Sequence, residues 1–306
     1  MRVLVFGGNG MLGHQLCRSL PEAMEVWATF RAEPEDFRFL PKERRLSHVL
    51  VQDTSRVEQI LEMVKPNAVI NAVGIVKQRG EAREAVPSIQ VNALFPHQLA
   101  DLCVPRGIRL IHVSTDCVFS GSRGMYTESD VPDPVDLYGR SKLLGELERA
   151  GCLTLRTSVI GWELGGHLGL LSWFVGQRGK QVKGFRRAVY SGLSTRVFCE
   201  LIGSLLAEHG DLQGLYHVSS APIAKFDLLV ALRNALGWSD LSVEPQEEPV
   251  CDRSLDGSRF RLATSWQAPK WEAMIQGLAE EWPEYEPVYS RHLGYGVNLE
   301  DEDAGE

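Results

Sequence analysis

The sequence predicts an α/β protein, with a doubly wound parallel Rossmann sheet followed by a smaller C-terminal α/β lobe. Three observations favour this class. Short apolar runs without a polar face alternate with amphipathic helical stretches through the first half, as in parallel strands covered on both sides. A glycine-rich turn follows the first run, and chemically distinctive residues follow later ones. From about residue 160, glycines and basic residues become frequent and mark a second region.

The elements of the first half can be predicted in order. Apolar and β-branched runs indicate strands, and apolar residues at helical spacing indicate the helices between them. Thr54 or Ser55 is the expected N-cap of the second helix. The predicted strands are 2–6, 25–30, 48–51, 68–71, 109–113 and 153–155. The predicted helices are 11–20, a segment that begins near residue 54, 88–104 and 138–149.

The second half contains fewer strong patterns. Helical stripes at 195–208 and 225–236 enclose a strand-like run at 215–218. We therefore expect a first domain over 1–160, to which residues 189–219 return. Residues 161–188 and 220–298 are expected to form the smaller lobe, and the acidic residues 299–306 a disordered tail.

Composition excludes several classes of protein. Apolar residues make up 44% and charged residues 24%, as in a globular chain, and no apolar run approaches the ~18 residues of a membrane span. The N-terminal apolar run is too short for a signal peptide, so we expect a cytoplasmic protein without a membrane partner. A net charge of −8 predicts no nucleic-acid face. The six cysteines and the scattered histidines lack paired spacing, so free thiols and no metal site are expected.

Gly7, Gly10 and Gly13 form a G-x-x-G-x-x-G pattern between the first strand and the first helix. Glycine allows a tight turn and a close approach of the backbone to a pyrophosphate, whose charge the helix N-terminus stabilises. The pattern predicts a dinucleotide site, with a glycine turn that binds no ligand as the alternative.

Arg31 stands near the end of the second predicted strand, where an NAD site usually has an acidic residue. A guanidinium suits the 2′-phosphate of NADP(H), so NADPH is favoured and NADH remains the alternative. The other interpretation of Arg31 is a surface residue without a ligand.

Tyr138 and Lys142 lie one helical turn apart, and Thr115 follows the fifth predicted strand. An ammonium beside a phenol favours the phenolate, so we expect a lowered pKa for Tyr138. Such a tyrosine can donate a proton to a carbonyl oxygen that Thr115 holds in place while hydride reaches the carbon. This combination predicts a reductase.

These residues stand in a set of motifs that resembles the extended short-chain dehydrogenase/reductases, and within them the dTDP-4-dehydrorhamnose reductases. The motifs are GGNGMLG (7–13), Asp53 in VQDTS, NAVG (71–74), VNA (91–93), STDCVFSG (114–121), YGRSKLLGE (138–146) and RTS (156–158). The resemblance implies hydride transfer from NAD(P)H to a sugar-nucleotide substrate bound by the C-terminal lobe. It implies Thr115, Tyr138 and Lys142 as catalytic residues. It implies a cofactor site lined by Gly7, Gly10, Met11, Leu12, Asp53, Ala72 and Gly74, with Lys142 reaching the nicotinamide ribose.

Two alternatives remain, and both involve a resemblance. Cys117 stands where the rhamnose reductases carry an aromatic residue, and a cysteine occupies the matching place in the GDP-fucose synthases. With His167 it would form the acid–base pair of a bifunctional epimerase/reductase, if Lys142 or His167 lowers the thiol pKa. The other alternative is a non-catalytic NADP-binding subunit similar to the regulatory β subunit of methionine adenosyltransferase. Whether the protein is a homodimer stays open.

Overall fold

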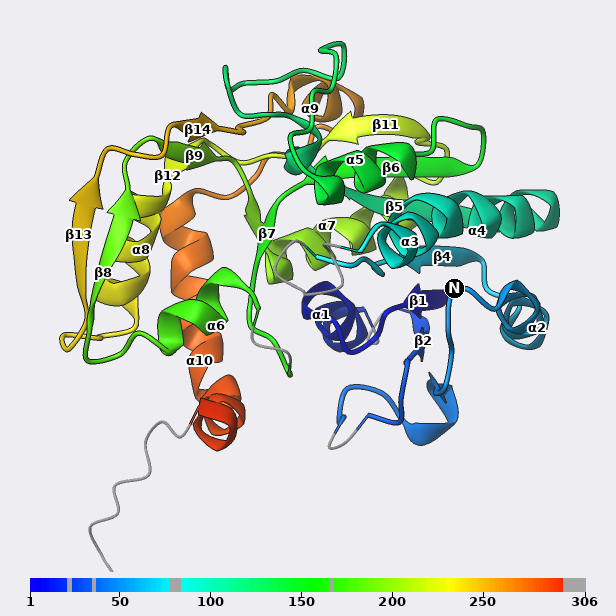
Figure 1. Ribbon diagram of the computed structural model, residues 1–306. Coiled ribbons are helices and arrows are strands. Elements are labelled where there is room, and N and C mark those ends of the chain that lie inside the picture. Colours follow the sequence, from blue (N-terminus) through cyan, green and yellow to red (C-terminus); the bar gives the residue numbers. More distant parts are fainter. Residues whose placement is uncertain (21–23, 35–36, 77–83, 166–167, 294–306) are drawn as a thin grey trace, which may run out of the picture.

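The computed structural model describes residues 1–20, 24–34, 37–76, 84–165 and 168–293. Its centre is a seven-stranded sheet in the order β11-β6-β5-β4-β1-β2-β3, in which all neighbours are parallel (Figure 1). The strands are β1 (Arg2–Phe6), β2 (Glu25–Thr29), β3 (Arg45–Leu46), β4 (Ala68–Asn71), β5 (Arg109–Thr115), β6 (Cys152–Thr157) and β11 (Gly214–His217). The predicted doubly wound α/β class is confirmed.

Alternating residues of these strands supply two separate cores, one on each face of the sheet. In β1, Val3 and Val5 belong to one cluster, which also contains residues of α1 and α7, while Leu4 and Phe6 belong to the other, with residues of α2 and α4. Both faces are buried because helices cover both. The α-helices are α1 (Met11–Ser19), α2 (Thr54–Val64), α3 (Ala85–Ser88), α4 (Phe95–Cys103), α5 (Leu137–Leu144), α6 (Leu170–Val175), α7 (Thr195–Glu208), α8 (Lys225–Ala235), α9 (Ser258–Thr264) and α10 (Trp271–Leu293).

The second half forms three small sheets that stand apart from the central one (Figure 1, left and centre). Their strands are β7 (Val159–Ile160), β8 (Gln181–Phe185), β9 (Ala188–Tyr190), β10 (Leu193–Ser194), β12 (Ile223–Ala224), β13 (Ser242–Gln246) and β14 (Cys251–Asp252). Helix α8 packs on β8 and β13, and α10 packs on α8. None of the described helices is long and apolar enough to cross a membrane.

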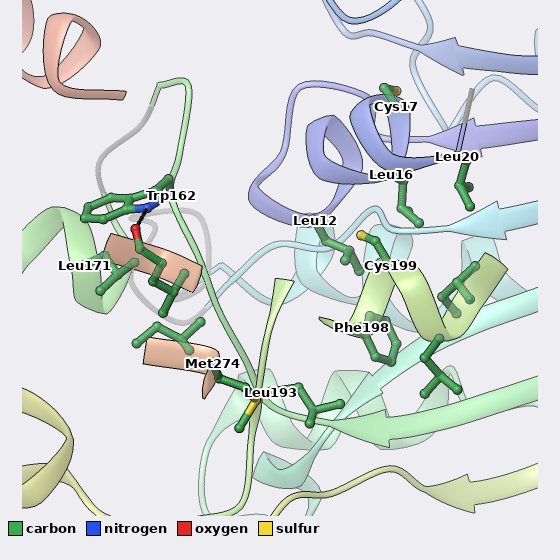
Figure 2. Packing of buried hydrophobic residues seen from close by; sticks show 14 of the residues in the cluster. Leu12, Leu16, Cys17, Leu20, Trp162, Leu171, Leu193, Phe198, Cys199 and Met274 are labelled. Atoms are coloured by element: carbon green, nitrogen blue, oxygen red, sulfur yellow. Dashed lines mark hydrogen bonds between the residues drawn. The ribbon is translucent and has the colours of Figure 1, made fainter. Parts of the chain in front are cut away.

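One hydrophobic cluster continues from the central sheet into this second region (Figure 2). Leu12 of α1 and Phe198 of α7 belong to it, as do Leu171 of α6 and Met274 of α10. Trp162 is 1% exposed and donates a 2.9 Å hydrogen bond from Nε1 to the Leu278 carbonyl. The indole is therefore part of this shared core.

Three predicted boundaries are wrong. The third strand is β3 rather than 48–51, because His48 has a φ of +58° that interrupts an extended run. The N-cap of α2 is Asp53, which precedes both expected caps. Helix α5 ends at Leu144 rather than at residue 149. Its C-cap is Gly145, where a Cβ would lie 2.0 Å from the Asn92 carbonyl oxygen. The predicted acidic tail lies outside the described residues.

Candidate active site at the carboxyl edge of the sheet

The glycine turn between β1 and α1 has the geometry of an anion site. Gly7 has a φ of +92°, and its carbonyl accepts a 3.0 Å hydrogen bond from the Gly10 N–H. A Cβ at Gly13 would lie 1.9 Å from the Gly7 carbonyl oxygen, so only glycine lets α1 approach β1 this closely. Among the described residues no side chain caps α1, so the N–H groups of Met11 and Leu12 are open to an anionic ligand. The turn fits a pyrophosphate.

The other cofactor candidates lie at the carboxyl ends of neighbouring strands. Arg31 is exposed just beyond β2. The Asp53 carboxylate accepts a 3.0 Å hydrogen bond from a backbone N–H in the first turn of α2, so one of its oxygens already caps that helix. Ala72 and Gly74 follow β4, and the Ala72 N–H donates to the Phe6 carbonyl at 3.2 Å. This bond sets the 72–74 loop beside the glycine turn.

Thr115 and Tyr138 bring two hydroxyl groups together. Thr115 ends β5, is 6% exposed, and accepts a 3.1 Å hydrogen bond at Oγ1 from the Cys117 N–H. Tyr138 stands in the first turn of α5, whose N-cap, Asp136, accepts a 2.8 Å hydrogen bond from the Gly139 N–H. Helix α5 packs against the turn at 116–118, which Thr115 caps. The two predicted catalytic side chains therefore lie near each other, and the Thr115 hydroxyl acts to lower the pKa of the phenol.

Lys142 lies one turn after Tyr138 and is only 4% exposed. Its Nζ donates a 2.7 Å hydrogen bond to the Val113 carbonyl of β5. Burial lowers the pKa of Lys142 to about 8, and the Glu146 carboxylate opposes this fall. The predicted lowering of the Tyr138 pKa is wrong: burial, with a contribution from Cys117, raises this pKa more than the Thr115 hydroxyl lowers it. The Lys142 ammonium is instead directed at the β5 backbone.

Cys117 has the opposite environment from the one that epimerisation requires. Burial raises the pKa of its thiol to about 12, and the neighbouring Asp116 carboxylate adds to the rise. The hypothesis that a positive field lowers this pKa is therefore wrong, because a protonated thiol is no base near neutral pH. His167, the second residue of that hypothesis, lies outside the described residues. Asp116 is 7% exposed and accepts a 3.2 Å hydrogen bond from the Thr115 hydroxyl.

Asn92 is a site residue that the sequence reasoning misses. It lies in the π-helical segment η3 (Ile89–Leu94), and its Oδ1 accepts a 2.8 Å hydrogen bond from the Ile75 N–H. Its Nδ2 donates to the Ile75 carbonyl at 3.0 Å and to Ser141 Oγ on α5 at 3.1 Å. One amide thus ties the 72–75 loop to the helix that carries Tyr138. The sequence does contain a signal for this role, an asparagine inside an apolar segment. A buried side-chain amide needs hydrogen-bond partners, so such a residue is expected to bridge neighbouring elements.

The carboxyl edge of the sheet gathers groups with complementary chemistry. At the glycine turn, the start of α1 has no side-chain cap and offers backbone N–H groups to the pyrophosphate of a dinucleotide. Near the end of β5 lie a threonine hydroxyl and a protonated phenol, and a buried amine stands one helical turn beyond the phenol. Such a pair of hydroxyls can bind a carbonyl oxygen and protonate it as charge develops there.

Proteins similar to this chain include named sugar reductases. The probable low-salt glycan biosynthesis reductase Agl14 of Haloferax volcanii is 36% identical over 148 residues, which is 48% of this chain and 48% of that protein. The match therefore spans about half the length of that relative. The dTDP-4-dehydrorhamnose reductase of Aggregatibacter actinomycetemcomitans is 27% identical over 307 residues, which cover 90% of this chain and 98% of that protein.

A solved structure shows the same fold. The dTDP-4-dehydrorhamnose reductase of Bacillus anthracis, crystallised in complex with NADP, has a TM-score of 0.77 at 23% identity and covers 92% of this chain and 99% of its own. The family model described as the RmlD substrate binding domain matches residues 1–281, a range that includes every candidate site residue. The chain belongs to the RmlD substrate-binding-domain family.

Proposed function

We propose that this protein is an NADPH-dependent reductase of a nucleotide-activated 4-keto-deoxysugar. The observation that carries the proposal is that Thr115, Tyr138 and the buried Lys142 lie at the same carboxyl edge of the sheet as an uncapped glycine turn. The names of the relatives support the same reaction class. The reaction belongs in the cytoplasm, with the sugar nucleotide as the partner molecule.

The residues at the edge of the sheet fit a dinucleotide cofactor. The NADP of the Bacillus anthracis relative supports NADPH, and NADH remains the alternative. Arg31 is the residue proposed to pair with a 2′-phosphate, and its exposed position just beyond β2 supports this role. When bound, the cofactor supplies the hydride. The residues proposed to hold it are Gly7, Gly10, Met11, Leu12, Gly13, Arg31, Asp53, Ala72, Gly74 and Lys142.

The side chains of the chain itself would manage the proton. The Thr115 hydroxyl holds the ketone oxygen, and the Tyr138 phenol transfers its proton to that oxygen as the carbon is reduced. The raised pKa keeps the phenol protonated at neutral pH, so in the free protein it is a donor rather than a base. Lys142, one helical turn further on and with a pKa of about 8, is the proposed source from which Tyr138 would regain its proton after each turnover.

The substrate is expected to lie between the carboxyl edge and the second region. We assign residues 161–188 and 220–298 to a sugar-nucleotide lobe, and residues 1–160 with 189–219 to the cofactor domain. This assignment is supported by the separate sheets of the second region and by the place of β11 in the central sheet. Trp162 is buried in the hydrophobic core, so its indole is not available to stack on the base of the nucleotide.

The test is a screen of dTDP-, GDP-, UDP- and CDP-linked 4-keto-deoxysugars, each with NADPH and with NADH. We expect cofactor oxidation and a reduced sugar with at least one of them, and faster turnover with NADPH. Solvent deuterium is expected to be absent from the carbons beside the ketone. Deuterium at those carbons would show epimerisation. Stoichiometric co-purification with another protein, without oxidation of NADPH by any sugar, would contradict the proposal and favour a regulatory subunit.

A further inference from the structure

A buried ion pair lies beneath the catalytic helix and has no part in the reaction as described so far. Arg156 of β6 binds Glu146 through both carboxylate oxygens, from Nε at 2.8 Å and from Nη2 at 2.7 Å. The two side chains are only 5% and 6% exposed. A buried pair of this kind is weak support for stability by itself, because desolvation costs about as much as the attraction gains. Its position in the fold suggests another role.

The pair is surrounded by partners that fix its position. The Ser114 hydroxyl of β5 donates to Glu146 Oε1 at 2.6 Å. On the other side, Arg156 Nη1 lies 3.2 Å from His217 Nε2 of β11, and its guanidinium stands 5.2 Å from the Phe119 ring centroid. Strands β5, β6 and β11 therefore hold the Glu146 carboxylate at one point below the end of α5.

This point is defined relative to Lys142. Glu146 follows Lys142 by four residues, in the turn that ends α5, and it is bonded to Ser114. The Lys142 ammonium donates a hydrogen bond to the carbonyl of Val113, which directly precedes Ser114 in β5. Both ends of this helical turn are thus fastened to adjacent residues of β5. We propose that Glu146, clamped by Arg156, is a positioning residue that holds Lys142 in its reactive place and protonation state.

The charges around Lys142 support this assignment. Burial lowers the pKa of Lys142, and Glu146 is the charged group that raises it. The neighbouring His112 is neutral, because burial lowers its pKa well below the usual range. The elements packed around α5 also carry other titratable groups. They are Arg109 of β5, Arg140 and Tyr138 of α5, Asp116 and Cys117 of η5 (Asp116–Val118), and His97, Asp101 and Cys103 of α4, where His97 bonds the Leu144 carbonyl. Loss of the Glu146 charge would therefore make Lys142 lose its proton at lower pH.

The inference rests on the proposed function for its kinetic readout and not for its structural one. Glu146→Gln removes the charge and keeps an amide of similar size. We expect the alkaline limb of the kcat profile to move down by about one pH unit. NMR titration of the free protein labelled with ¹³C at the lysine Cε should show the same shift of the Lys142 pKa, with the signal assigned through Lys142→Arg. The single variant Arg156→Lys keeps both charges of the ion pair, so it should retain most of the wild-type pH profile.

Two further variants keep the test decisive. Glu148→Gln, at an exposed glutamate two residues away, is the matched control and should change neither readout. If Glu146→Gln does not fold, the double variant with Arg156→Met leaves no buried unpaired charge and should still lower the Lys142 pKa. If the pKa of Lys142 were unchanged in the folded Glu146→Gln variant, or in the double variant that replaces it, the inference would be overturned. A normal Lys142 titration in a protein that reduces none of the sugars would overturn the proposed function alone.

Discussion

Tyr138 keeps its proton because of where α5 places the phenol. The helix begins at a loop capped by Asp136, and its first turn lies over Thr115 at the end of β5. Burial there disfavours a phenolate, and the amine one turn away is bonded to the sheet. In the free protein the Tyr138 phenol is therefore protonated, so it can donate a proton and is not a base.

Tyr138→Phe tests this role at the level of one atom. Removal of the donor should lower kcat by about 10²–10⁴-fold, because general acid catalysis typically contributes that much. NADPH affinity, measured by fluorescence titration, should stay at the wild-type value. Tyr216→Phe is the control, since this tyrosine lies on β11 and packs against Phe260 of α9. Near wild-type turnover in Tyr138→Phe would contradict the mechanism.

At the scale of elements, the union of β1 and α1 depends on a glycine that helix propensity disfavours. Glycine inside a helix costs about 1 kcal/mol relative to alanine. Gly13 is retained because a Cβ there would lie 1.9 Å from the Gly7 carbonyl oxygen. Gly203, inside α7, has no such constraint, since its nearest contact would be Leu20 Cδ2 at 3.4 Å.

The same substitution should therefore have opposite effects in these two helices. Gly13→Ala should lower the free energy of unfolding by about 1–3 kcal/mol through overpacking, and should weaken NADPH binding. Gly203→Ala should raise it by about 0.5–1 kcal/mol through helix propensity. Urea denaturation with parallel cofactor titration measures both. Equal changes in the free energy of unfolding for the two variants would show that the close contact between α1 and β1 does not require glycine at position 13.

The elements also show what a sequence can and cannot predict. Strands apolar on both faces were predictable because both faces are buried, and Thr115, Tyr138 and Lys142 because each follows a strand or shares a helix face. The run at 48–51 was misread as a strand, since Val49 and Val51 are buried without being extended neighbours in the sheet. Asn92 was missed because its role depends on three-dimensional contacts with Ile75 and Ser141. Burial, with contributions from Cys117 and Asp116, reversed the expected direction of the Tyr138 pKa shift.

At the scale of the whole molecule, the last helix reaches back to the first. His14 of α1 is 1% exposed, and its Nδ1 lies 2.9 Å from the Gly10 carbonyl and its Nε2 2.8 Å from the Tyr285 hydroxyl of α10. Burial lowers the pKa of His14 to about 4. The neutral ring therefore joins the glycine turn to α10.

This neutral histidine predicts acid sensitivity. Because its pKa is lower in the folded state, the unfolded chain binds more protons, and stability falls as pH drops from about 6.5 towards 4. The loss is up to about 3 kcal/mol for His14. His14→Gln should flatten this decline in urea denaturation between these pH values. His209→Gln is the control. If wild type and His14→Gln declined in parallel, the burial of His14 would not be the cause.

The place of β11 has a consequence for how the protein is made. Strand β11 pairs with β6, yet residues 158–213 separate the two along the chain. During synthesis β6 leaves the ribosome well before its neighbour, and its outer edge stays unpaired until residue 217 has emerged. A fragment that stops at residue 160 would keep that open edge permanently and would also lack α7, which covers one face. Such a fragment should aggregate, so the part of the chain that forms the central sheet cannot be isolated by truncation at residue 160.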